Sequence, residues 1–69
     1  MTLGARNKLE GEVIEIKRGG VMCQVRVRIA GNNIMESVMT NDSAEEMGLK
    51  VGDKVQVAVK AVNVMLVKD

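Results

Sequence analysis

The sequence contains no phenylalanine, tyrosine, tryptophan, proline or histidine, and its 69 residues include a single cysteine. Without aromatic rings, no side chain can stack on a nucleic-acid base, a contact worth about 1 to 3 kcal/mol per base. Without histidine, the chain lacks the side chain most used for zinc binding and for acid–base catalysis near neutral pH. These absences argue against a nucleic-acid-binding barrel and against an enzyme.

The single cysteine, Cys23, cannot form a disulfide within the chain. It lies in a strand-like run, which predicts a buried or interface thiol and favours a reducing, cytoplasmic setting. No apolar run approaches the ~20 residues of a membrane span, and "MTLGARNKLEGE" lacks the apolar core of a signal peptide. Ten Lys and Arg balance nine Asp and Glu, giving a net charge of +1, so any charged site must be local.

The length predicts a single domain over residues 1–69. A domain of about 60 residues buries only about 60% of the surface that its unfolded chain exposes. The core must be built from Val, Ile, Leu, Met and Ala, which together with Cys23 supply all of the 46% apolar content. We therefore expect a partner subunit to contribute to stability.

Apolar and polar residues alternate in several segments, as they do in half-buried antiparallel strands. The clearest alternation covers residues 21–29, between a Gly19–Gly20 turn and the turn signal "AGNN". Further strands are predicted around Val13 to Ile16 and over residues 34–40, 54–62 and 64–67.

One helix is predicted, over residues 43–47 and closed by Gly48. Both Asp42 and Ser43 have a glutamate three residues later, so either can be the N-cap. The element order predicts an all-β fold, a five-stranded barrel of the oligonucleotide/oligosaccharide-binding kind with one short helix between strands 3 and 4. An SH3-like barrel and an open five-stranded meander give a similar order of elements.

The candidate site residues are those that can donate hydrogen bonds to an anion. Thr40 and Ser43 place two hydroxyls at the predicted helix start, where backbone N–H groups lack partners. Lys60 interrupts an apolar run near the end of a strand, and Arg6 precedes the first strand. The alternative is structural: the hydroxyls cap the helix, Lys60 is solvated and Arg6 belongs to a frayed terminus.

Three segments in this order resemble the molbindin (Mop) family of molybdate-binding proteins, a TOBE-like domain. They are "ARN" before the first strand, "TNDS" followed by an acidic helix, and the segment from "AVKA" to "VML". The resemblance covers nearly the whole chain. It implies a hexamer, a trimer of dimers, that stores or buffers molybdate or tungstate between its subunits and is not an enzyme.

The resemblance also implies which residues contact the oxyanion. Arg6, Thr40, Ser43 and Lys60 match the family's anion-binding positions. Gly4 stands where the family usually has a serine, so that a backbone N–H of Gly4 or Ala5 would have to replace the lost hydroxyl. A structural assembly module without a ligand is the alternative function, in which Arg6 and Lys60 form ion pairs between subunits.

Molybdate suits these residue types because it is a dianion that is fully deprotonated near neutral pH. Its oxygens accept hydrogen bonds only, and Thr, Ser, Lys, Arg and backbone N–H groups can all donate. Phosphate is partly protonated and needs an acceptor, whose absence costs about 1 to 3 kcal/mol. Asp42 would supply that acceptor unless it caps the helix, so selectivity depends on the identity of the N-cap.

Overall fold

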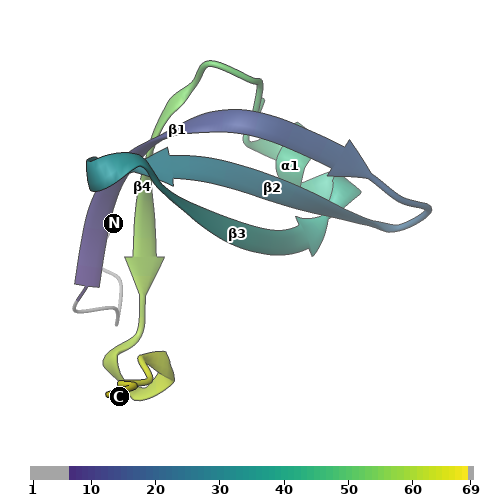
Figure 1. Ribbon diagram of the computed structural model, residues 1–69. Coiled ribbons are helices and arrows are strands. Elements are labelled where there is room, and N and C mark those ends of the chain that lie inside the picture. The colour runs from purple at the N-terminus through teal and green to yellow at the C-terminus, as the bar shows by residue number, and fades with distance from the viewer. Residues whose placement is uncertain (1–6, 69) are drawn as a thin grey trace.

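The computed structural model describes residues 7–68, which form an antiparallel sheet of four strands in the order β3-β2-β1-β4 (Figure 1). One α-helix lies between the third and fourth strands, and two 3-10 turns complete the elements. The prediction of an all-β fold with a short helix at this place is confirmed. The elements are β1 (Asn7–Arg18), β2 (Met22–Ile29), η1 (Ala30–Asn32), β3 (Asn33–Thr40), α1 (Asn41–Glu46), β4 (Lys54–Val59) and η2 (Ala61–Asn63).

Strand β1 is long enough to pair with two neighbours. Its first half, from Asn7 to Glu12, pairs with β4, and the part from Gly11 onward pairs with β2. The register with β2 shifts after Val13, which is a bulge that bends the strand. Where the two pairings overlap, a Cβ on Gly11 would lie 2.5 Å from Val27 Cγ1, so only glycine fits there without displacing β2. The bend allows β1 to pair with β4 along its first half and with β2 along its second half, as the curved ribbon of β1 shows (Figure 1).

The core is small and aliphatic, and the predicted alternation in β2 is confirmed. Cys23, as predicted, is buried and free, and its sulfur packs on the inner face of the sheet. The outer face carries the charges: Arg26 pairs with Glu15 at 3.8 Å and with Glu36 at 3.5 Å. The buried residues are Val13, Cys23, Val25, Val27, Ala44 and Leu49.

The prediction of a five-stranded barrel is wrong for the described residues, which form an open sheet of four strands. Strand β4 ends at Val59 rather than at residue 62, and residues 64–67 form no strand. The one-turn helix η2, held by the Asn63 N–H donating to the Lys60 carbonyl at 2.9 Å, directs the chain away from the sheet (Figure 1). Because the tail reaches no sheet edge, its apolar side chains stay exposed.

The helix prediction is correct in place and wrong at its start. Helix α1 begins at Asn41 and ends at Glu46, and Gly48 follows with a φ of +64°, the left-handed conformation expected after a helix. Within residues 7–68, no helix has the length and apolar character that crossing a membrane requires.

Candidate functional site

The hydroxyls of Thr40 and Ser43 meet at the start of α1. Thr40 is the N-cap: its Oγ1 accepts a hydrogen bond from the Ser43 backbone N–H at 3.0 Å. The same hydroxyl donates its proton to Ser43 Oγ at 2.8 Å. Both predicted caps, Asp42 and Ser43, are therefore wrong, because the helix begins two residues earlier than expected. The Ser43 hydroxyl accepts from Thr40, so its own proton is not used in this bond and can be donated to another acceptor.

Asn41 holds the backbone at the start of α1, between Thr40 and Ser43, in place. Its backbone N–H donates to the Val21 carbonyl at 2.8 Å, and its Nδ2 donates to the carbonyls of Gly19 at 3.1 Å and Gly20 at 3.4 Å. The side chain thereby ties the helix start to the turn between β1 and β2. Sequence reasoning did not identify this role, since the partners lie about twenty residues away and no local pattern indicates them.

Asp42 lies in the first turn of α1 and is exposed. Its carboxylate does not cap the helix, since Thr40 performs that role. A carboxylate therefore remains beside the hydroxyl pair. Its negative charge interacts favourably with the positive end of the helix dipole and repels an anion that approaches Ser43.

Lys60 lies at another part of the molecule. It is exposed and directly follows Val59, which pairs with Asn7 at the beginning of β1. The predicted residues Gly4, Ala5 and Arg6 lie outside the described residues, just before Asn7. Lys60 is therefore beside the start of the described chain.

Thr40, by contrast, lies near the other end of β1. It pairs with Met22, whose neighbour Cys23 pairs with Arg18. Asn7 and Arg18 are separated by the length of β1, about 36 Å of strand path at roughly 3.3 Å per residue. The structure thus brings Thr40 and Ser43 together but does not bring Lys60 to them. One chain alone does not surround an anion with all three side chains.

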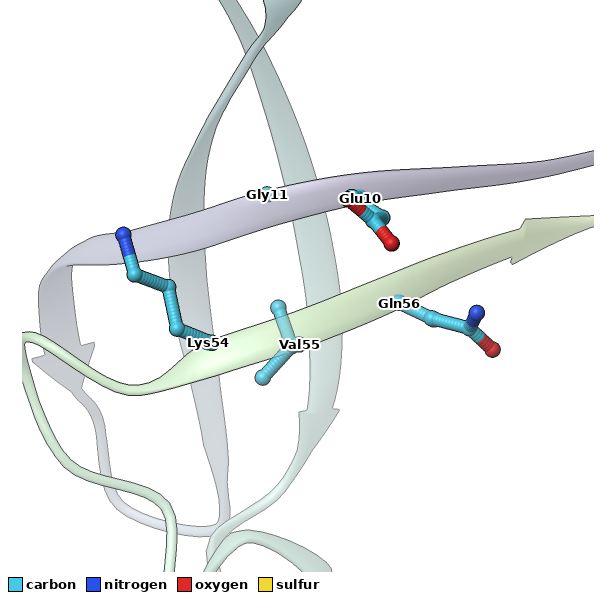
Figure 2. Close-up of a pocket in the computed structure, with 5 residues that line it drawn as sticks. All are labelled: Glu10, Gly11, Lys54, Val55 and Gln56. Atoms are coloured by element: carbon cyan, nitrogen blue, oxygen red, sulfur yellow. The ribbon is translucent and has the colours of Figure 1, made fainter.

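A shallow depression of about 310 Å³ lies over the β1–β4 pairing and contains none of the predicted site residues. Figure 2 shows the residues that line it, Glu10 and Gly11 on β1 and Lys54, Val55 and Gln56 on β4. The residues that line this depression include no hydroxyl donor, and the charge of the Glu10 carboxylate offsets that of Lys54. The hydroxyl pair remains the better candidate for an anion contact.

Among known protein families, the TOBE domain matches this chain, over residues 4–66. A curated relative, molybdenum-pterin-binding protein 2 of Clostridium pasteurianum, is 41% identical over 66 residues, which cover 96% of this chain and 97% of the relative.

Two solved structures share the fold at full length. The molybdate-binding protein from Sporomusa ovata superimposes with a TM-score of 0.92 and 35% identity, covering 99% of this chain and 100% of that one. MopII from Clostridium pasteurianum superimposes with a TM-score of 0.89 and 39% identity, covering 97% and 100%. The open, four-stranded arrangement therefore occurs in a chain that matches these proteins along almost its whole length.

Proposed function

This chain belongs to the TOBE domain family, and on that premise we propose that it binds molybdate at sites shared between copies of the chain. The matched structure from Sporomusa ovata is a molybdate-binding protein. Its similarity to this chain covers both ends of the candidate site, the helix entry and the end of β4. Binding, rather than catalysis, is the activity that we propose.

The observation that carries the proposal is the hydroxyl pair at the helix entry. In the 2.8 Å bond from Thr40 to Ser43 Oγ the serine oxygen is the acceptor, so the Ser43 proton is free for a different acceptor. A fully deprotonated tetrahedral oxyanion offers only acceptors, so this proton matches it. Asn41 holds the pair in place through two glycine carbonyls, which limits the reorganisation needed on binding.

Cationic side chains are needed as well, and we assign that role to Lys60 and Arg6. A unit-charge contact at about 4 Å is worth roughly 4 kcal/mol at an effective dielectric of 20, before desolvation. A micromolar dissociation constant requires about 8 kcal/mol net. Two cations therefore fall short once desolvation is subtracted, and hydroxyl donors such as Ser43, with a backbone N–H of Gly4 or Ala5, supply the rest.

The separation of Thr40 from Lys60 is the reason for proposing shared sites. The two lie toward opposite ends of β1 in one copy. Two copies can place the helix entry of one beside the β4 end of the other. We propose a homo-oligomer, a hexamer built as a trimer of dimers, that stores or buffers molybdate or tungstate in the cytoplasm.

We propose the free oxyanion, rather than a molybdenum–pterin compound, as the ligand. The name of the Clostridium relative includes a pterin. A planar pterin ring offers two faces for stacking, and this sequence has no aromatic residue to stack on either face. The described hydroxyls and Lys60 are donors that fit a small tetrahedral anion.

Isothermal titration calorimetry tests the proposal directly. Molybdate and tungstate should bind, whereas sulfate, phosphate and a soluble pterin should release no heat at the same concentrations. Lys60→Ala should weaken molybdate binding at least tenfold. Lys54→Ala is the matched control, because Lys54 begins the strand after which Lys60 follows, and its side chain is 83% exposed. Absence of heat with every oxyanion would reject the proposal and favour an assembly module without a ligand.

A further inference from the structure

Helix α1 brings negative charge to the candidate anion site. It carries the carboxylates Asp42, Glu45 and Glu46 and no basic residue, and all three acidic residues are exposed. A dianion that approaches the Ser43 hydroxyl is therefore repelled by this helix before a hydrogen bond can form. An anion site at the helix entry needs positive charge from a neighbouring element.

Two cations, Lys17 and Arg18, end strand β1 beside the helix entry. The turn that follows them is bonded to the first residue of α1, since Asn41 Nδ2 donates to the carbonyls of Gly19 at 3.1 Å and Gly20 at 3.4 Å. These bonds hold the turn against the helix start. The two cations directly precede this turn, so the same bonds keep the end of β1 close to α1.

The pairing of the strands gives the distance from Lys17 to the hydroxyl pair. Lys17 pairs with Gln24 on β2, and Gln24 pairs with Val38 on β3. Two strand spacings of about 4.8 Å, and two residues along β3, place the Lys17 backbone about 12 Å from that of Thr40. A charge at this distance acts through solvent, within the Debye length of about 30 Å at 0.01 M ionic strength.

An open depression of about 290 Å³ covers the sheet surface between these cations and β3. Its lining includes Lys17, Arg18, Gln24, Met22 and Val38, and no acidic residue belongs to it. Val38 and Thr40 share one face of β3, because side chains two residues apart on a strand point the same way. The depression therefore leads across the sheet toward the hydroxyl pair.

The charges of Lys17 and Arg18 are not neutralised by a neighbour, since neither residue forms an ion pair within residues 7–68. Three other cations of the sheet, by contrast, each lie within 4 Å of a glutamate carboxylate. These paired cations are Arg26, Arg28 and Lys54.

We propose that Lys17 and Arg18 attract the oxyanion through solvent and guide it to the Ser43 hydroxyl, without joining the donors that finally hold it. This inference rests on the proposed molybdate site. Within one copy, the two positive charges offset the carboxylates of α1, whereas Lys60 is contributed by a second copy. Attraction of this kind depends on charge rather than on shape, so selectivity among dianions stays with the donors.

The test removes both charges from the full chain, as Lys17→Gln combined with Arg18→Gln, and measures molybdate affinity by calorimetry from 0.01 M to 1 M ionic strength. Both residues are exposed, so circular dichroism should show an unchanged fold. The matched control is Arg28→Gln combined with Lys54→Gln, which removes the same charge from the same sheet. Those two cations lie 3.5 Å and 3.6 Å from Glu12, and Arg28 is near the opposite end of β2 from the helix entry.

At 0.01 M ionic strength, the dissociation constant of the double variant should be about fivefold higher than that of the wild type, because two unit charges at about 10 Å attract a dianion. At 1 M, where the Debye length is about 3 Å, the two affinities should agree within about twofold. The control variant should stay within about twofold of the wild type throughout. Convergence at high salt separates attraction through solvent from a direct contact, whose loss would persist.

Three results would overturn the inference. Equal affinity of the double variant and the wild type at every ionic strength would show that the two cations do not act on the anion. A loss that stays equally large at 1 M would show that one of them contacts the anion directly. An equal loss in the control would show that net charge alone governs binding. A wild type that binds no molybdate at any ionic strength would reject the proposed function itself, so the two failures are distinguishable.

Discussion

Thr40 caps helix α1 by accepting the Ser43 backbone N–H at 3.0 Å, and the same hydroxyl donates to Ser43 Oγ at 2.8 Å. Thr40 is therefore a structural cap, whereas the hydroxyl proton of Ser43 is not used in capping the helix. This division makes the two hydroxyls separable by mutation, although they lie only three residues apart at the start of one short helix.

The first prediction compares Thr40→Val with Ser43→Ala. Thr40→Val removes the cap and should lower the free energy of unfolding by about 1 kcal/mol. Ser43→Ala leaves the capping bond to its backbone N–H intact and should change stability little. It should nevertheless weaken molybdate binding by about tenfold to a hundredfold, because a hydrogen bond to a charged group is worth about 1.5 to 3 kcal/mol. Urea unfolding followed by circular dichroism and calorimetry check the two effects.

Equal loss of stability in both variants would show that Ser43 is also structural. Thr40→Ser is the control for the cap, since it retains a hydroxyl at the same backbone position. It should restore most of the stability that Thr40→Val loses.

The second prediction concerns Asp42, whose carboxylate lies in the first turn of α1 without capping it. Asp42→Asn should strengthen molybdate binding about fivefold, because a unit charge at about 8 Å repels a dianion by about 1 kcal/mol in water. The same change should lower stability by about 0.3 to 1 kcal/mol through the helix dipole. It also replaces a charged acceptor for the proton of phosphate by the weaker, neutral amide oxygen of asparagine, so the preference for molybdate over phosphate should increase.

Glu46→Gln is the matched control, as it removes one negative charge at the opposite end of the same helix. It should leave molybdate affinity nearly unchanged and should not reduce stability. A rise in affinity equal to that of Asp42→Asn would mean that net charge alone, rather than the position of Asp42, governs binding.

The third prediction tests the close approach of β1 to β2 at Gly11. Gly11→Ala would place a Cβ 2.5 Å from Val27 Cγ1 and 3.0 Å from the Arg28 carbonyl oxygen. Overpacking of this kind costs about 1 to 3 kcal/mol. Gly20→Ala is the control, because a Cβ there meets no atom within 4 Å. Chemical unfolding should show a clear loss for Gly11→Ala and no comparable loss for Gly20→Ala.

Local patterns were sufficient to predict most of the sheet. Alternation identified the residues of β2 whose side chains are buried, including Cys23, and Gly48 marked the end of the helix. The start of the helix was mispredicted because glutamates follow both Asp42 and Ser43 at capping-box spacing, whereas Thr40 looked like the last residue of a strand. The actual cap depends on Asn41 contacting the distant Gly19–Gly20 turn, which no local pattern encodes.

The fifth strand was mispredicted for a related reason. Residues 64–67 have the apolar composition of a strand, but β-propensity reflects packing on a neighbour rather than a property of the backbone alone. In the described chain the tail has no such neighbour. The apolar composition of residues 64–67 therefore led to the prediction of a fifth strand in the sheet, whereas the structure places this segment away from the sheet. Local patterns also cannot predict how far Lys60 lies from Thr40, because that distance depends on the curvature of β1.

The last prediction follows from that distance. If one anion site takes its hydroxyl donor from one copy and Lys60 from another, Ser43→Ala and Lys60→Ala chains should each bind molybdate weakly alone. After the subunits are mixed and reassembled, about a quarter of the sites should combine an intact Ser43 with an intact Lys60. Calorimetry on the mixture should then detect a tight class of sites that neither variant has. If Ser43 and Lys60 of the same copy acted together, every site would keep one altered residue, and mixing would restore no tight binding.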